Sequence, residues 1–325
     1  MINFAVIGTN WITESFIEGA HKSKMLLLTA VYSRQLNRAM DFAKQYESVT
    51  CFDDLALLAN SDVIDAVYIA SPNSLHYQQT IQLLKAGKHV ICEKPLGSNL
   101  TEVEEMYRVA QESGVILFEA FKTPYLPNFA VIKDNLSRLG AIRKATISYC
   151  QYSSRYQKYL NGENPNTFNP MFSNGSVMDI GYYCIASAIA LFGEPLRIQA
   201  SAYLLDTGVD AQGSVILSYD GFDAVINHSK VSDSSLPSEI QGEEGSLTIN
   251  HISQCYNVYW NPRGGNPEEL TVDSVKNSMQ YEAEFFAKQI RAGKRDEGSV
   301  ERSLLTAKVI TEVRRLTGVV YPSDE

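Results

Sequence analysis

The sequence has few cysteines, and their spacing is not that of a structural framework. Its 325 residues include five cysteines, an odd number, with no Cys-x-x-Cys pair among them. Neither a disulfide framework nor a metal site is therefore expected, and reduced thiols are the default. The five positions are Cys51, Cys92, Cys150, Cys184 and Cys255.

Long apolar runs and an excess of basic charge are also missing. No stretch approaches the roughly 18 consecutive apolar residues of a membrane span, and the first residues lack the basic and apolar segments of a signal peptide. We therefore expect a cytoplasmic protein without a membrane partner. The net charge of −9, from 28 basic and 37 acidic residues, is unsuited to holding a phosphate backbone, so nucleic acid is not an expected partner either.

What is present is an ordinary globular composition with a pattern in two parts. Hydrophobic residues make up 45% and charged residues 20% of the chain, whose length suits two domains. In residues 1–121, short apolar segments alternate with amphipathic ones in the rhythm of a parallel sheet covered by helices on both faces. This predicts a doubly wound, Rossmann-type α/β domain that binds a dinucleotide, with strands at residues 2–8, 26–33, 65–71, 88–93 and 115–120.

Residues 122–325 show longer β-rich segments, many with alternating polar and apolar residues. They predict a C-terminal α/β domain with a large open sheet, mixed and mainly antiparallel, for substrate binding and oligomerisation. Because a large exposed apolar sheet face is a liability, we expect it to pair in a homodimer or higher homo-oligomer. The segments concerned are 141–154, 214–231 and 246–260.

The turn after the first strand departs from the usual dinucleotide pattern Gly-x-Gly-x-x-Gly. Gly8 is retained, but Asn10 and Thr13 replace the second and third glycines. Asparagine tolerates the left-handed backbone region better than most residues, so Asn10 either takes that conformation and contacts the pyrophosphate or turns away from it. Either way the turn precedes a helix whose N-terminus can hold an anion. The cofactor-binding candidates here are Gly8, Thr9, Asn10, Trp11 and Ile12.

The end of the second strand carries basic rather than acidic residues. An NAD-specific site usually has an acidic residue here for the ribose 2′-hydroxyl, whereas this chain has Ser33, Arg34 and Arg38. A hydroxyl and guanidinium groups suit a 2′-phosphate, which predicts NADP(H) as the preferred cofactor, with NAD(H) possible. The alternative is that these arginines merely solvate the start of a helix.

Three stretches together resemble one known family. Residues 68–77 (YIASPNSLHY), 91–97 (ICEKPLG) and 175–186 (GSVMDIGYYCIA) are similar to the Gfo/Idh/MocA family of nicotinamide-dependent oxidoreductases. Residues 151–170 look most like its branch of dimeric dihydrodiol dehydrogenases and NADP-dependent aldose dehydrogenases. The resemblance implies reversible hydride transfer at the carbinol or carbonyl carbon of a sugar, polyol or cyclic trans-diol.

The resemblance also implies the catalytic residues. The family's motif lysine falls on Lys94, and its Asp-x-Gly-x-His pattern on Asp179, Gly181 and Tyr183, with tyrosine in place of the commoner histidine. A tyrosine has a pKa near 10 and needs a nearby cation to act as a base at neutral pH, which Lys94 would supply. We therefore expect Tyr183 to be the general acid/base, Lys94 to assist it, and Asp179 to orient the substrate or Lys94. The alternative for Tyr183 is a core residue with its hydroxyl hydrogen-bonded.

Further binding residues are expected around these. His76 resembles the family's residue beside the nicotinamide, and Pro72 and Asn73 are expected to line the cofactor. A polar and aromatic cluster in residues 155–168 would hold the substrate, and Lys230 is a lower-ranked candidate. The remaining cofactor candidates are Ser71 and Glu93, and the substrate candidates are Arg155, Tyr156, Asn166, Phe168 and Lys122.

Two other functions stay open at this level. The altered glycine turn would suit a non-catalytic nucleotide sensor, although the retained Lys94, Asp179 and Tyr183 argue against one. A redox-neutral glycosidase that uses bound NAD transiently is the other, and the arginines after Ser33 disfavour it.

Overall fold

The computed structural model describes all 325 residues, which pack into two compact units. Unit 1 comprises residues 1–122 and 275–303, and unit 2 comprises residues 123–274 and 304–325. The division by sequence alone, 1–121 and 122–325, keeps both parts contiguous. Packing instead returns a late segment, residues 275–303, to the N-terminal unit.

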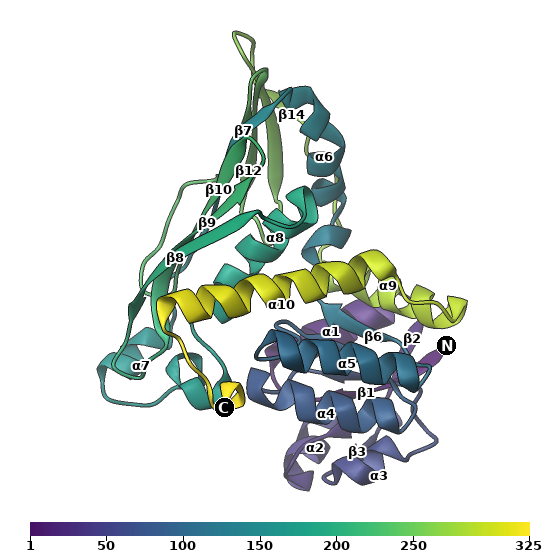
Figure 1. The fold of residues 1–325 in the computed structure, drawn as a ribbon. Coiled ribbons are helices and arrows are strands. Elements are labelled where there is room, and N and C mark those ends of the chain that lie inside the picture. Colours follow the sequence, from purple (N-terminus) through teal and green to yellow (C-terminus); the bar gives the residue numbers. More distant parts are fainter. The chain divides into compact units, whose positions relative to one another are not determined.

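Unit 1 is built on a six-stranded parallel sheet with the strand order β3-β2-β1-β4-β5-β6 (Figure 1). This order is that of doubly wound dinucleotide-binding domains, which confirms the fold class predicted from the sequence. Its central strands β1 and β4 are almost wholly buried because helices cover both faces. The strands are β1 (Ile2–Ile7), β2 (Leu26–Tyr32), β3 (Thr50–Phe52), β4 (Ala66–Ile69), β5 (His89–Glu93) and β6 (Leu117–Ala120).

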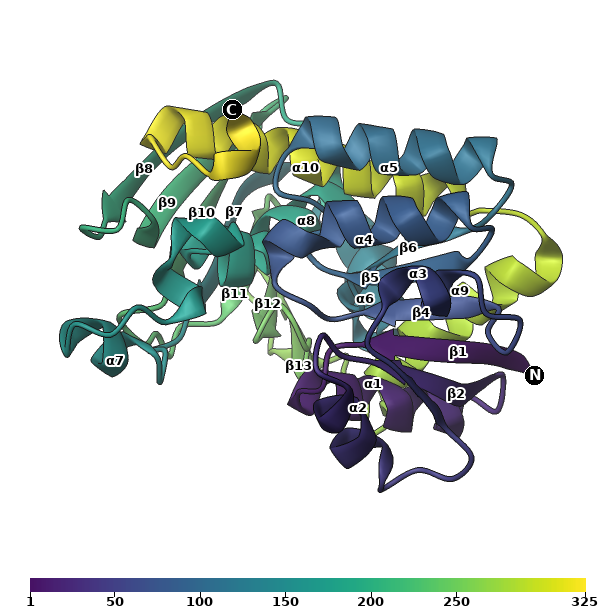
Figure 2. The same ribbon diagram turned by 90° about the horizontal axis from the view of Figure 1, so that it is seen from below.

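Helices lie on both faces of this sheet. Figure 2 shows α4 and α5 on one face and α1 and α2 on the other. The returning helix α9 packs against α1, which is why residues 275–303 belong to unit 1. The helices are α1 (Trp11–Lys22), α2 (Leu36–Ala43), α3 (Leu55–Ala59), α4 (Asn73–Lys85), α5 (Leu100–Glu112) and α9 (Met279–Ala292).

Unit 2 is built on an eight-stranded sheet with the order β14-β13-β12-β11-β7-β10-β9-β8. β7 and β10 pair in parallel and the other neighbours are antiparallel, which confirms the predicted mixed, mainly antiparallel sheet. The strands are β7 (Ile142–Cys150), β8 (Arg197–Leu204), β9 (Asp210–Tyr219), β10 (Phe222–Ser229), β11 (Ser238–Gly242), β12 (Gly245–Asn250), β13 (Asn257–Pro262) and β14 (Glu268–Glu269).

A mostly buried helix, α8 (Tyr182–Phe192), packs against β7 and β10 on one face of this sheet (Figure 1). A π-helical turn, Val177–Gly181, leads directly into it. The other helices are α6 (Pro127–Asn135), α7 (Tyr156–Leu160) and α10 (Glu297–Thr317), the last shared between the two units. Short 3₁₀ turns span Thr123–Tyr125, Leu136–Leu139, Asn166–Phe168, Pro170–Phe172 and Pro322–Asp324.

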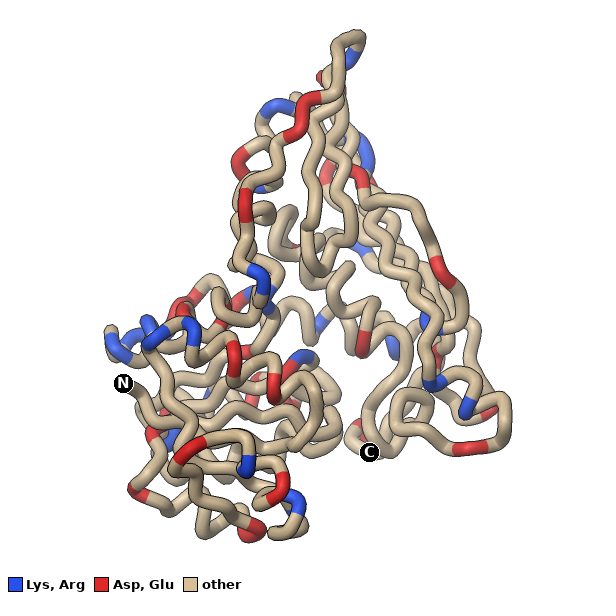
Figure 3. The backbone as a smooth tube through the Cα atoms, turned by 180° about the vertical axis from the view of Figure 1, so that it is seen from behind, with Lys and Arg blue, Asp and Glu red and all other residues tan.

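Residues 170–192 form the one helical stretch that is long and apolar enough, by length and composition alone, to cross a membrane. Its apolar window is 72% buried inside the structure, as expected of a core helix. Acidic and basic residues are interspersed along both units rather than gathered by sign (Figure 3).

Candidate active site

The turn after β1 is shaped around Gly8. Its φ of +110° lies in the region that side chains rarely adopt, and a Cβ there would lie 2.7 Å from the carbonyl oxygen of Ala70, after β4. Glycine is therefore required for the close approach of the two strand ends. The turn is the part of the usual dinucleotide pattern that this chain retains, and it leads to the N-terminus of α1, where a phosphate group would bind.

Of the two alternatives considered for Asn10 from the sequence, the structure excludes the left-handed one. Its backbone is extended, with φ −121° and ψ 174°, so the left-handed alternative is wrong. The side chain caps α1 instead, accepting from the backbone N–H of Ile12 at 3.0 Å and of Thr13 at 3.2 Å. Its Nδ2 donates to the Ala70 oxygen at 3.2 Å. Asn10 thus substitutes for the missing glycine by fixing the helix start to the end of β4.

The basic residues after β2 remain available to a ligand. Ser33 is half-buried, while Arg34 and Arg38 are exposed and their guanidinium groups form no hydrogen bond or ion pair within the chain. Unpaired guanidinium groups are suited to bidentate binding of a phosphate. Elsewhere in this loop, Trp11 is 74% exposed.

His76 is fully buried beneath the turn that carries Lys94. Its Nδ1 lies 2.9 Å from the carbonyl oxygen of Pro95 and its Nε2 lies 2.9 Å from that of Ser71. Burial lowers the pKa of His76, so the ring is neutral and its single N–H can donate to only one carbonyl at a time. The histidine predicted to border the cofactor therefore also joins the turn after β4 to the turn after β5.

The Lys94 turn is held from a second direction as well. The Lys94–Pro95 peptide bond is cis, and the next backbone N–H, of Leu96, donates to Glu119 Oε1 at 2.8 Å. Glu119 is 8% exposed and also accepts from the Ser303 hydroxyl at the start of α10, within unit 1. The position of Lys94 thus depends on contacts from three separate segments.

A group of buried ionisable side chains lies next to this turn in unit 1. Glu93 accepts from the Tyr68 hydroxyl at 2.7 Å, and burial raises the pKa of both Glu93 and Glu282 of α9. Burial lowers the pKa of Lys122, while Glu282 and Glu93 act to raise it. The lysine predicted to bind substrate thus interacts electrostatically with these two carboxylates.

In unit 2, the π-helical turn and α8 carry Asp179 and Tyr183. Asp179 forms an ion pair with Lys230, which follows the end of β10 and is only 7% exposed. The sequence ranked Lys230 low because exposed lysines are common on strands. Its burial and its carboxylate partner place it with the motif residues instead. Asp179 and Tyr183 are both half-buried.

His228 supports this turn from the sheet. It is 2% exposed, its Nδ1 lies 2.8 Å from Ser176 Oγ, and Asp210 Oδ2 accepts from the Val177 N–H at 2.6 Å. Gly181 of the motif packs directly on the imidazole, since a Cβ there would lie 3.0 Å from His228 Cγ. The glycine of the Asp-x-Gly-x-Tyr pattern is thereby explained by close packing rather than by its backbone angles.

Tyr183 belongs to a line of aromatic rings that sequence reasoning missed. Its ring centroid lies 5.9 Å from that of Tyr149, which in turn lies 4.8 Å from that of His251. The Tyr149 hydroxyl donates to Gln151 Oε1 at 3.2 Å. Nothing separates Tyr149 from the other 17 of the chain's 18 tyrosines except its place at the end of β7.

The structure brings together only part of the predicted substrate cluster. Tyr156 of α7 and Phe168 have ring centroids 5.8 Å apart, but Phe168 is 0% exposed and also packs against Tyr159. Arg155 and Asn166 are exposed at the start of α7 and in a 3₁₀ turn. Their roles in substrate binding stay predictions.

The doubly wound sheet, the glycine turn and the helix N-terminus beside it define unit 1 as a dinucleotide-binding domain, and the class of protein as an NAD(P)-binding oxidoreductase. Residues 2–121 match the family model described as an oxidoreductase family with an NAD-binding Rossmann fold. Residues 135–248 match the Gfo/Idh/MocA C-terminal domain. The chain therefore belongs to the Gfo/Idh/MocA family, as the sequence motifs indicated.

Individual relatives agree with this assignment. The chain is 56% identical over 324 residues to the uncharacterized oxidoreductase YgjR of Escherichia coli, covering 100% of this chain and 99% of the relative. It is 50% identical over 327 residues to the scyllo-inositol 2-dehydrogenase (NADP(+)) IolU of Bacillus subtilis, covering 100% of both chains. It is 30% identical to the trans-1,2-dihydrobenzene-1,2-diol dehydrogenase of Danio rerio, covering 91% of this chain and 90% of the relative.

A solved structure shares the fold. The 3-ketoreductase KijD10 of Actinomadura kijaniata, solved with NADP and TDP-benzene, superposes with a TM-score of 0.88 at 24% identity, covering 97% of this chain and 98% of that one. The relatives from Bacillus subtilis and Danio rerio are named as dehydrogenases, and the chain is an oxidoreductase of the same family.

Proposed function

We propose that this chain is an NADP(H)-dependent dehydrogenase that interconverts a carbinol and a carbonyl group on a sugar, polyol or cyclic trans-diol. The observation that carries the proposal is the retention of the whole motif set in supported positions. Lys94 lies on a turn fixed by His76 and Glu119, and Asp179 and Tyr183 lie on a turn fixed by His228 and Asp210. A chain that only sensed a nucleotide would have no use for this proton-transfer set.

The preference for NADP(H) is supported by two features. Arg34 and Arg38 are exposed and without an ion-pair partner, and a 2′-phosphate provides one. The relative IolU, at 50% identity over its whole length, is named as an NADP(+) enzyme. The tight turn at Gly8 leads into the N-terminus of α1, which can hold an anion, so the residues present fit a dinucleotide.

In the proposed reaction, residues of the chain accept the proton of the substrate hydroxyl in oxidation and return it in reduction. A nicotinamide cofactor held by unit 1 would supply the hydride chemistry, as acceptor when the C–H bond of the carbinol is broken in oxidation and as donor in reduction. As that C–H bond breaks, the substrate hydroxyl gives its proton to Tyr183, and the carbonyl forms between the same carbon and oxygen. Lys94 favours the phenolate of Tyr183 and hydrogen-bonds the substrate oxygen. Asp179 keeps the Lys230 ammonium oriented beside the reacting groups.

Absorbance at 340 nm tests this proposal. The purified chain is mixed with NADP⁺, and in parallel with NAD⁺, and a panel containing scyllo-inositol, aldoses and cyclic trans-diols. A rise in absorbance on at least one substrate, larger with NADP⁺, is the expected result. Tight binding of NADP(H) without turnover on any of them would favour the non-catalytic sensor instead.

We also propose that the sheet of unit 2 pairs two copies of the chain. From Ala224 to His228 of β10 buried residues alternate with half-buried ones, and α8 packs on one face of the sheet. Light scattering at micromolar concentration should give at least twice the monomer mass of 36.2 kDa. A monomer would contradict this part of the proposal.

A further inference from the structure

Residues 319–324 contact the segment that leads into the π-helical turn of unit 2. Figure 1 shows them in yellow, where the chain turns back after α10. Tyr321 is 1% exposed, and its hydroxyl donates to the carbonyl oxygen of Asn174 at 2.8 Å, a contact between positions 147 residues apart. Burial raises the pKa of Tyr321, so the hydroxyl keeps its proton and stays a donor. Both residues belong to unit 2, and Asn174 lies shortly before the turn begins at Val177.

Arg314 of α10 anchors the 319–324 segment. It is 2% exposed, and its two terminal nitrogens donate to the two carboxylate oxygens of Asp324 at 2.7 and 2.9 Å. The same carboxylate accepts from the Tyr321 N–H at 2.8 Å, and the guanidinium carbon lies 4.3 Å from the centroid of the Tyr321 ring. Such a pair is costly to break, because a buried charge is then left without a partner. Arg314 and Asp324 therefore keep Tyr321 in one position.

The residues that follow Asn174 are fixed from the sheet. Ser176 Oγ lies 2.8 Å from Nδ1 of His228 in β10, and the Val177 N–H donates to Asp210 of β9 at 2.6 Å. The chain thus enters the π-helical turn between contacts from two strands and the contact from Tyr321.

The π-helical turn is not explained by its own sequence. Residues 176–192 contain no proline, so nothing in the covalent chain prevents the commoner α-helical hydrogen-bond pattern there. Each hydrogen bond of a π-helix spans one residue more than in an α-helix, and relaxation to the α-helical pattern would rotate the two sides of the turn against each other by roughly 100°. Asp179 lies within the turn and Tyr183 in α8. Their relative direction, and the ion pair of Asp179 with Lys230, therefore depend on contacts that maintain the π-helical pattern.

From these observations we propose that the 319–324 segment holds the π-helical turn in its hydrogen-bond pattern, and that Tyr321 is a positioning residue for Asp179. In this role Tyr321 touches no reacting group and acts through the carbonyl of Asn174 on the point where the turn begins. The consequence for catalysis rests on the proposed function of Asp179 and Tyr183, but the hold on the turn does not.

Hydrogen exchange measured by mass spectrometry on the full chain tests the hold on the turn without any substrate. Tyr321→Phe keeps the ring beside Arg314 and removes only the hydroxyl. The backbone amides of residues 176–181 should exchange about tenfold faster in this variant, because the turn opens more often when one of its outside contacts is lost.

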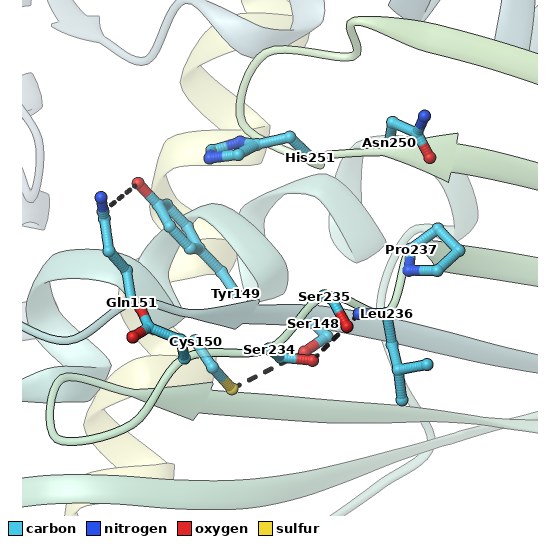
Figure 4. Close-up of a pocket in the computed structure, with 11 residues that line it drawn as sticks. Ser148, Tyr149, Cys150, Gln151, Ser234, Ser235, Leu236, Pro237, Asn250 and His251 are labelled. Carbon is cyan, nitrogen blue, oxygen red and sulfur yellow. Dashed lines mark hydrogen bonds between the residues drawn. The ribbon is translucent and has the colours of Figure 1, made fainter.

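A second tyrosine provides the matched control. Tyr219→Phe also removes a hydroxyl that donates to a backbone carbonyl, that of Gly193 at 3.4 Å, but at the other end of α8. It should leave the exchange of residues 176–181 unchanged. Residues 234–237, a loop of unit 2 shown in Figure 4, should exchange equally in wild type and both variants. Unchanged exchange of residues 176–181 in Tyr321→Phe, or the same increase in Tyr219→Phe, would overturn the proposal.

Steady-state kinetics test the positioning of Asp179. Tyr321→Phe should lower kcat about tenfold and leave the KM for NADP(H) unchanged, because the turns expected to bind the cofactor lie in unit 1. In an Asp179→Asn background the same substitution should lower kcat by less than about twofold, since effects that act through one residue are not additive. Equal losses in the two backgrounds would reject the positioning role.

Asp324→Asn tests the same segment from its anchor and does not alter Tyr321. It weakens the ion pair with Arg314 but keeps an oxygen for the Tyr321 N–H, so exchange and kcat should change in the same direction as in Tyr321→Phe by a smaller factor, about threefold. No change in either quantity would contradict the anchoring role of Arg314 and Asp324. Faster exchange in the variants of a chain that turns over no substrate would reject the proposed function and retain the hold on the turn.

Discussion

The turn that carries Lys94 in unit 1 and the turn that carries Asp179 in unit 2 each rest on a buried histidine. His76 is 0% exposed and His228 is 2% exposed. Burial lowers the pKa of both, to about 4 for His228. In both units a neutral imidazole thus lies under a turn, and that turn carries a residue with a role in the proposed reaction.

The surroundings of the two histidines differ. His76 meets two backbone carbonyls, which do not titrate. His228 meets a serine hydroxyl and, at 3.8 Å from its Nδ1, the Asp210 carboxylate. Burial raises the pKa of Asp210 to about 6, although the N–H of Val177 acts in the opposite direction. The support in unit 2 therefore contains a group that changes charge at moderately acidic pH.

The largest effect is expected when the reacting group of unit 2 is changed and the residues that support its turn are not. Tyr183→Phe removes one hydroxyl and leaves His228 and Asp210 in place, so kcat should fall on the order of 10² to 10⁴-fold with NADP(H) affinity intact. Steady-state kinetics and a cofactor titration measure the two quantities. Tyr182→Phe, on the adjacent and buried tyrosine, is the matched control. An unchanged kcat in Tyr183→Phe would remove Tyr183 from the mechanism.

The next effect tests the acidic group under the unit 2 turn. The pKa of Asp210 is about 6 in the folded chain and about 3.9 in the unfolded chain. Protonation of Asp210 therefore stabilises the folded state; this stabilisation is fully present below about pH 4 and is lost as the pH rises through 6. Asp210→Asn keeps an oxygen for the Val177 N–H but does not titrate. The unfolding free energy of wild type minus that of the variant should fall by on the order of 3 kcal/mol between pH 4 and 7. Urea unfolding across this range measures it, and a flat or rising difference would contradict the assignment.

A smaller effect is expected from the support in unit 1. His76→Ala leaves a cavity and removes the hydrogen bond to the carbonyls of Ser71 and Pro95, which should lower the unfolding free energy by about 2 kcal/mol. NADP(H) affinity should weaken in parallel, because two turns predicted to bind the cofactor lose their link. Gln78→Ala, exposed on the same helix, is the control and should change stability by less than about 0.5 kcal/mol. Full cofactor affinity in His76→Ala would show that the turns hold without the histidine.

The smallest effect concerns Asn10, which supports the turn after β1 in unit 1 without a histidine. Asn10→Ala removes the cap of α1 and should cost about 1 kcal/mol of stability, whereas Asn10→Gly should cost only a few tenths. Because the amide is occupied by Ile12, Thr13 and Ala70, we expect Asn10→Gly to keep NADP(H) affinity within about threefold. A much larger loss of affinity in Asn10→Gly would indicate direct contact with the pyrophosphate.

The sequence predicted the parts of the molecule whose signals are local. Five strands of the unit 1 sheet follow from short apolar runs, but β3 has only three partly exposed residues and leaves no such run. Asn10 is also determined locally, but asparagine is favoured both in the left-handed region and as a helix N-cap. It caps the helix here because the backbone N–H groups of Ile12 and Thr13 need an acceptor.

The residues that the sequence ranked low or missed depend on contacts between distant segments. Lys230 meets Asp179 because the π-helical turn Val177–Gly181 packs against β10, a contact that no period in the sequence specifies. Tyr149 and His251 come together in the same way, through strands whose order in the sheet differs from their order in the chain. Contacts of this kind require the register of a whole sheet to be known first.

The parallel pairing of β7 with β10 also bears on how the chain folds. The intervening residues 151–221 must be spanned before Ala145 can pair with Ala224, whereas β9 and β10 close through a short turn. Non-local pairing is slow because the loop entropy is lost before the contact compensates for it. Refolding should therefore form the β9–β10 hairpin early and complete the pairing of β7 with β10 late, so that the ring contact between Tyr149 and Tyr183 is among the last features of unit 2 to assemble.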